Sequence, residues 1–165
     1  MNSGTTRLDE WQPAITTHTR VLQIIVGALI TGVLAFAGFV VFTGALQQPP
    51  KPGFLSQLAV VMAAINVALH AIIPSIIERS ALANQSVGSG VPQLLGVFQT
   101  RTIIAAALLE GAALFATVTV MIEHQSWVLV VTGVLLLLLL LQFPTTTRVE
   151  QWLETRLMDQ DVGRT

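Results

Sequence analysis

The sequence predicts an all-α membrane protein with four transmembrane helices in an antiparallel up-and-down bundle, followed by a C-terminal amphipathic interfacial helix. First, 53% of its 165 residues are hydrophobic and only 10% are charged, whereas soluble domains carry about 25% charged residues. Second, the apolar residues form four long runs separated by polar connections. Third, arginines gather on alternate connections, as in a multi-pass membrane protein. We expect a single membrane domain over residues 1–165.

The first two spans are predicted on either side of a proline-rich turn. Crossing a hydrocarbon core of about 30 Å takes roughly 20 apolar residues. The run at residues 21–46 has no charge, is too long for a signal-peptide core and shows no cleavage pattern. We therefore expect an uncleaved span there, after an N-terminal flank at residues 1–20. The turn at residues 47–53 reads QQPPKPG, which no helix continues through, and the second span follows at residues 54–77.

The other two spans follow a longer connection. Residues 78–101 join the second span to the third and include a polar glycine-serine turn at residues 84–90. The third span, residues 102–122, contains Glu110, and the fourth, residues 126–143, contains an unbroken leucine tract. Because tight connections make sequential helices antiparallel neighbours, we expect an up-and-down bundle.

The tail at residues 147–165 is predicted to form an amphipathic helix on the membrane surface. Thr147 and Glu150 have the spacing of a capping box, and apolar residues that include Trp152 and Leu153 follow at helical spacing. We expect these Trp and Leu side chains to face lipid and the polar side chains to face water. The simplest role of such a helix is that of an anchor.

Basic residues predict the side of the membrane on which each connection lies. Lys51 is the one basic residue on the first and third connections, and the arginines occupy the terminal flanks and the second connection. Because cytoplasmic loops carry an excess of Lys and Arg, we expect a multi-pass protein of the cytoplasmic (inner) membrane with both termini in the cytoplasm. The seven arginines on that side are Arg7, Arg20, Arg79, Arg101, Arg148, Arg156 and Arg164.

Small residues predict which helix faces pack together. Gly27, Thr31 and Ala35 recur every four residues in the first span, and alanines form similar strips in the second and third spans. Because such spacing lets helix backbones approach closely in lipid, we expect spans one to three in the interior and the leucine-rich fourth span at the periphery. The expected partners are the lipid bilayer and other membrane chains, in a homo-oligomer or a larger complex that contacts these Ala/Gly faces.

Three polar residues inside the spans are the candidate functional residues. Glu110 lies nine residues beyond Arg101, about 13 Å along a helix and near the bilayer midplane. A charge there costs on the order of 2.5–3.5 kcal/mol, so the carboxyl is expected to be protonated, paired or in contact with a wet cavity. His70 is predicted at nearly the same depth in the second span, with Asn66 one turn away on the same face. If these spans pack as a hairpin, the three side chains are expected either to bind a proton or cation together or to hold two helices together.

A proline-containing stretch leads into the third span and its carboxylate. Residues 92–100 read PQLLGVFQT, residues 102–118 read TIIAAALLEGAALFATV, and eleven positions separate Gln99 from Glu110. Over Pro92 to Val120 this pattern resembles the second helix of the rotary ATP synthase proteolipid, subunit c. In that family, a polar cytoplasmic loop with a proline leads to an essential carboxylate in the middle of the membrane. The resemblance implies that Glu110 is a proton-binding carboxylate in an oligomeric ring that works against a separate stator.

The composition also excludes several function classes. Without cysteine there is no disulfide, thiolate catalysis or cysteine metal site, and a net charge of −1 gives no basic excess for binding nucleic acid. The spans hold no phosphate loop, nucleophile elbow, metal-binding His pair or paired carboxylates, so we expect neither an enzyme nor a cofactor. Two functions stay open. One is a proton-binding, proteolipid-like membrane protein, and the other is a non-catalytic scaffold or accessory subunit in which Glu110 and His70 only hold helices together.

Overall fold

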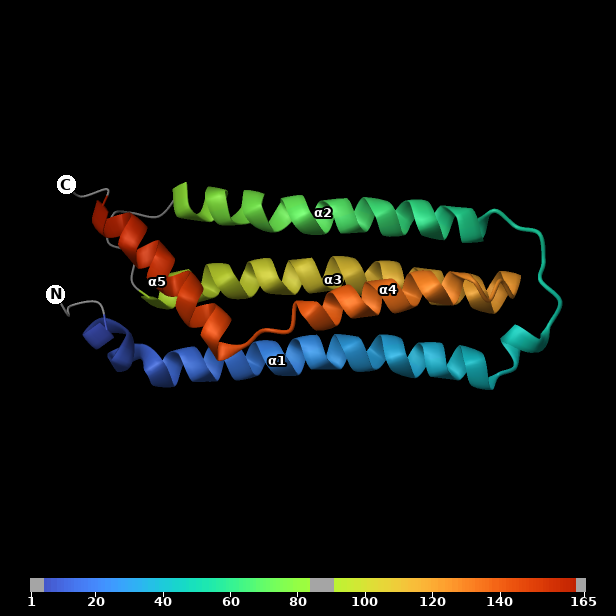
Figure 1. Cartoon of the computed structure of the whole chain (residues 1–165), viewed down its shortest axis with the longest axis horizontal. Helices are drawn as coiled ribbons and strands as arrows, with labels where there is room; N and C mark the ends of the chain where they lie inside the picture. Colours follow the sequence, from blue (N-terminus) through green and yellow to red (C-terminus); the bar gives the residue numbers. More distant parts are fainter. Residues whose placement is uncertain (1–4, 84–90, 163–165) are drawn as a thin grey trace.

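The computed structural model describes residues 5–83 and 91–162, which form five α-helices and one short 3₁₀-helix with no strand among them. Helices α1 to α4 lie side by side along the molecule, and α5 crosses them at one end, where α1 begins (Figure 1). We call this the basic end, because it carries Arg101, Arg148 and Arg156. The predicted turn at residues 84–90 and Arg164 lie outside the described residues. The elements are α1 (Thr5–Phe42), η1 (Ala45–Gln47), α2 (Leu55–Ala83), α3 (Val91–Glu123), α4 (Val128–Leu141) and α5 (Thr146–Val162).

Three helices are long and apolar enough to cross a membrane, at Glu10–Phe42, Leu55–Ser80 and Val91–Glu123. Helix α4 has only 14 residues, which at about 1.5 Å per residue cover roughly 21 Å, short of a core of about 30 Å. Counted together with α5, from which it is bent by 62°, α4 gives a fourth candidate span. The structure thus confirms that the described residues are all-helical and include helices long and apolar enough to cross a membrane. The fourth span, the topology and the membrane side of each connection stay predictions.

Helix α3 is the centre of the bundle. It packs against α1, α2 and α4, whereas α1 and α2 have no close backbone contact within the described residues. In the most apolar stretch of α3, half of the residues are buried, whereas in the most apolar stretch of α2 only 6% are buried. The expected packing was therefore wrong for two helices: α4 belongs to the core, and α2 lies at the periphery. Leucine and alanine are equally compatible with lipid and with a protein neighbour, so composition does not separate the two environments. The buried side chains of α4 are Val128, Thr132, Leu135 and Leu139.

At the basic end, the predicted N-terminal flank and the predicted surface helix form one apolar cluster. Helix α1 is continuous from the flank into the first span, and its Ile15 is fully buried. On α5, Val149 and Leu153 are buried against α1 and α3. The expectation that the apolar face of α5 meets lipid was therefore wrong for Leu153. Apolar residues that would suit a membrane surface here pack against the protein. They do so because α1 and α3 extend beyond the predicted spans and present apolar side chains to α5.

At the opposite end, Glu123 ties α3 to the first turn of α2. Its carboxylate accepts hydrogen bonds from the backbone N–H groups of Leu55 and Ser56, both at 2.8 Å, and from Ser56 Oγ at 2.5 Å. The backbone N–H of Lys51 donates to the Glu123 carbonyl at 2.9 Å. A Cβ atom at Gly53 would collide with the Glu123 carboxylate, so this close approach requires glycine. The acid therefore caps α2, whose N-terminal N–H groups lack partners within the helix.

A short break at residues 142–145 turns the chain from α4 into α5. Pro144 cannot donate a backbone hydrogen bond, which favours the end of α4 here. Helix α5 begins at Thr146, and Thr145 Oγ1 accepts from the backbone N–H of Arg148 at 3.4 Å. The predicted Thr147–Glu150 capping box was therefore wrong: Thr145, two residues earlier, caps the helix, and Arg148 stands where a box needs Glu or Gln. Glu150 instead accepts a hydrogen bond from Gln12 Nε2 on α1 at 3.0 Å.

Candidate functional site

Glu110 lies on the side of α3 that faces α1. It is partly exposed, and a Cβ atom added to Gly32 on α1 would lie 3.9 Å from its Oε1 atom. Among the described residues Glu110 has no hydrogen bond and no ion pair. The absence of a side chain on Gly32 leaves room for the carboxyl between the two helices.

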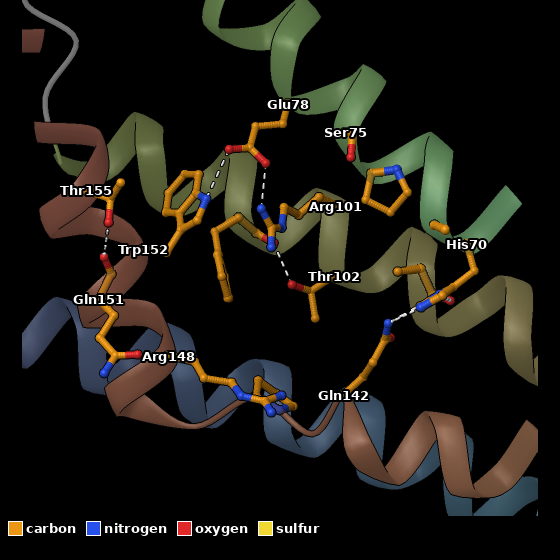
Figure 2. A pocket seen from close by; sticks show the side chains of 15 residues that line it. His70, Ser75, Glu78, Arg101, Thr102, Gln142, Arg148, Gln151, Trp152 and Thr155 are labelled. Atoms are coloured by element: carbon orange, nitrogen blue, oxygen red, sulfur yellow. Dashed lines mark hydrogen bonds and ion pairs between the residues drawn. The ribbon is translucent and has the colours of Figure 1, made fainter. Parts of the chain in front are cut away.

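His70 lies on α2 and joins three elements. Its Nδ1 atom is 3.2 Å from the carbonyl oxygen of Ala105 on α3, and its Nε2 atom contacts Nε2 of Gln142 just after α4. Figure 2 shows the His70 and Gln142 side chains pointing toward one another. One tautomer satisfies both contacts: Nδ1–H donates to Ala105, and the Gln142 amide donates to an unprotonated Nε2. His70 thus links α2 to α3 and to the residue that follows α4.

The structure does not bring the three predicted polar residues into one cluster. Asn66 Nδ2 donates to the carbonyl of Met62 in its own helix, at 2.8 Å. Ala105, which meets His70, and Glu110 are five residues apart, which is about 140° around an α-helix. His70 and Glu110 therefore lie on different flanks of α3. The roles of Glu110, His70 and Asn66 in proton or ion binding stay predictions.

A second polar site, which the sequence did not predict, is built around Glu78 near the end of α2. The Glu78 side chain is 8% exposed. Its Oε2 accepts from Arg101 Nη1 at 2.5 Å, and its Oε1 accepts from Trp152 Nε1 at 3.1 Å and Arg156 Nε at 2.9 Å. A further short contact joins Arg156 Nη2 to the same oxygen. Helices α2, α3 and α5 thus share one carboxylate at the basic end.

Aromatic rings complete this Glu78 network. The rings of Phe98 and Trp152 have centroids 5.3 Å apart. The guanidinium of Arg101 lies 5.2 Å from the Phe98 centroid and 5.6 Å from the Trp152 centroid, and that of Arg156 lies 6.0 Å from the Trp152 centroid. Such cation–π contacts help to hold the guanidinium groups in place beside the Glu78 carboxylate.

The Glu78 network forms one wall of a cavity of about 570 Å³, which lies between α2, α3 and the α4–α5 segment. Figure 2 shows its polar lining: Glu78, Arg101 and Trp152 on one side, and Arg148, Gln142 and His70 on the other. Binding sites for small molecules have similar volumes, about 300–1,000 Å³. The cavity offers cationic and neutral hydrogen-bond donors to a polar guest.

The sequence held a recognisable sign of this site. Glu78 ends the second apolar run and Arg101 begins the third, so a hairpin places the two at one level. Trp152 and Arg156 are four residues apart and share a helix face. The sequence does not indicate the position of α5, because this position depends on the break at residues 142–145. Without α5, a glutamate at the end of an apolar run is expected to be solvated.

Comparisons with models of protein families, with curated protein sequences and with solved structures found no match to this chain. The resemblance of Pro92 to Val120 to subunit c therefore stays a prediction.

Proposed function

We propose that this chain is a non-catalytic, multi-pass protein of the cytoplasmic membrane that binds a proton at Glu110. The observation that supports this is the partly exposed Glu110 carboxyl beside Gly32, with no hydrogen-bond or ion-pair partner among the described residues. A carboxyl within an apolar span is costly and is therefore a functional candidate by default. With the basic end in the cytoplasm, Glu110 lies near mid-membrane, about 13 Å along α3 from Arg101.

The position of Glu110 suits reversible protonation better than a structural role inside one chain. A residue that only holds helices together is expected to bond to a neighbouring helix, as His70 does with the Ala105 carbonyl. Glu110 has no such bond within the described residues, so its protonation breaks no internal contact described there. A proton can therefore be gained or lost without disturbing the packing of α3 on α1.

An accessory subunit is the second candidate, and a specific surface favours it. Ala28, Gly32 and Ala35 on α1 are exposed and lie on the helix that borders Glu110. Small residues at this spacing let another helix approach closely, and a carboxyl beside them can bond to that helix. In this case Glu110 contacts a second membrane chain instead of carrying a proton.

Labelling with a hydrophobic carbodiimide tests the proton-binding proposal. The reagent adds to protonated carboxyls in apolar surroundings, so the labelling rate follows the protonated fraction of Glu110. We expect one adduct per chain, on Glu110, at a rate that falls as the pH rises, and no adduct in Glu110→Gln. Glu154→Gln, which removes an exposed carboxyl of α5, is the control and should label like the unchanged protein. Labelling that is absent, or that persists in Glu110→Gln, would refute proton binding at this residue.

Native mass spectrometry in detergent separates the two candidates. A closed ring of many copies is what the subunit c resemblance implies, whereas a monomer or small oligomer supports an accessory subunit. The substitution Glu110→Gln keeps the shape and a hydrogen-bonding amide, so an assembly based on neutral hydrogen bonds should persist. If Glu110 of the unchanged protein is labelled in a pH-dependent way and Glu110→Gln keeps the same number of copies, Glu110 is assigned to proton binding and not to assembly.

A further inference from the structure

We propose that the cavity at the basic end binds a phosphate group of an anionic ligand, with Arg148 and Arg101 as its main contacts. This inference does not depend on Glu110, which does not line the cavity. It rests on the charge balance, the available donors and the shape of the cavity.

The charge balance favours an anion. Two guanidinium groups, those of Arg101 and Arg148, line the cavity, and Glu78 is the carboxylate among the residues of its described lining. Both oxygens of Glu78 already accept bonds from Arg101, Arg156 and Trp152. The described lining thus holds two positive charges and one negative charge, and the oxygens of that one carboxylate are already occupied.

The arginines also have donors to offer. Arg101 uses one of its five N–H donors on Glu78, and its side chain stays 30% exposed. Arg148 uses Nη1 on the carbonyl of Leu141 at 2.9 Å, and its position on the first turn of α5 leaves it exposed. A planar guanidinium matches phosphate oxygens with two parallel bonds, so two arginines on opposite walls suit a phosphate between them.

The shape of the cavity suits a headgroup better than a bare ion. Its volume of about 570 Å³ exceeds that of a phosphate. Small apolar residues of α2 and α3, namely Ala71, Pro74 and Ala105, line the part next to His70, whereas the charged residues line the part toward α5. With the basic end in the cytoplasm, the charged part lies at the depth of inner-leaflet headgroups. Basic pockets between spanning helices on this side bind anionic lipids. The phosphate can therefore belong to a lipid or to a soluble ion.

Native mass spectrometry of the full chain with added lipid tests the proposal. The probes are phosphatidylglycerol, phosphatidylcholine and diacylglycerol. We expect retention in the order given, with no specific retention of diacylglycerol, which has no phosphate. Arg148→Gln should weaken the binding of phosphatidylglycerol about tenfold, because it removes a charge-assisted contact, and Arg148→Lys should restore part of it. Arg79→Gln is the matched control, because Arg79 is exposed on α2 and does not line the cavity.

Competition with inorganic phosphate then identifies the source of the group. Displacement of the lipid at millimolar phosphate assigns the site to the phosphate itself, and no displacement assigns it to the lipid. The proposal is overturned if Arg148→Gln and Arg79→Gln retain the same amount of lipid, or if diacylglycerol binds as well as phosphatidylglycerol. Because Arg148 is exposed, Arg148→Gln should fold, and an unchanged Tm verifies this. Glu110→Gln should leave lipid retention unchanged, so the two proposals fail independently.

Discussion

Replacing Glu78 by Gln is expected to loosen α5 from the bundle. The amide keeps the shape of the side chain and one acceptor oxygen, which can still serve Trp152 Nε1. It removes the negative charge that Arg101 and Arg156 share, and it turns an N–H₂ group toward one of these guanidiniums. Helices α2 and α5 have no close backbone contact within the described residues, so these side chains are their bridge.

The magnitude follows from the two arginine contacts. A hydrogen bond to a charged group contributes about 1.5–3 kcal/mol, so two such contacts set an upper range of about 3–6 kcal/mol. The side chains of Arg101 and Arg156 are 30% and 33% exposed, and the released guanidiniums can bind water instead. Pairs that are fully exposed contribute only about 0–1 kcal/mol. An intermediate cost of about 2–3 kcal/mol corresponds to a rise of roughly 30- to 160-fold in the local opening of α5.

Amide hydrogen exchange of α5 in detergent measures this opening directly. Glu78→Gln and Arg156→Gln should each accelerate exchange in α5, and the double variant should add little to either, because the two residues share one contact. Glu154→Gln removes an exposed acid of the same helix and should leave exchange unchanged. If Glu78→Gln exchanges like Glu154→Gln, the network does not hold α5 and the reasoning is refuted.

Two further predictions concern glycines that lie against carboxylates. Gly53→Ala should lower the Tm by several degrees, because its Cβ would overlap the Glu123 carboxylate that caps α2, whereas Gly27→Ala, which meets no atom within 4 Å, should not. A Tm equal to that of Gly27→Ala would show that the loop shifts without cost. Gly32→Val should slow carbodiimide labelling severalfold, because its Cβ would lie 3.9 Å from Glu110 Oε1 and its methyl groups would cover the carboxyl. Gly27→Val is the control for this experiment, and equal rates in the two variants would place the reagent's path elsewhere.

The helical architecture could be predicted because a bilayer imposes strong and simple constraints. Long apolar runs must be helical, since lipid offers no partner for backbone groups. This is why α2 begins and α3 ends within one residue of the predicted span boundaries, whereas in the predicted connection 78–101 α2 continues to Ala83 and α3 already begins at Val91. The arginines likewise predicted that α5 lies at the same end of the bundle as the starts of α1 and α3.

The site could not be predicted in the same way, because it depends on rotation about the helix axes. The depth of His70 and Glu110 follows from counting residues. The direction in which each side chain points depends on which helix packs against each side of α3. Glu110 was expected to face α2, but it faces α1, and His70 of α2 contacts Ala105 on another side of α3. The position of α5 depended on the bend at Pro144, so the partners of Glu78 were not visible in the sequence.

The two carboxylates that fix α2 have a consequence for how the protein is made. The first turn of α2 is capped by Glu123, which lies 68 residues after Leu55, and Glu78 receives Arg156, which lies 78 residues further along. The synthesis of α2 is therefore complete before Glu123 or Arg156 has been made. Early in synthesis, only its own hydrophobicity keeps α2 in place. The contacts of Glu78 with Trp152 and Arg156 form only when α5 emerges, so a chain that stops short of α5 would hold α2 by its packing on α3, the Glu123 cap and the Arg101 contact alone.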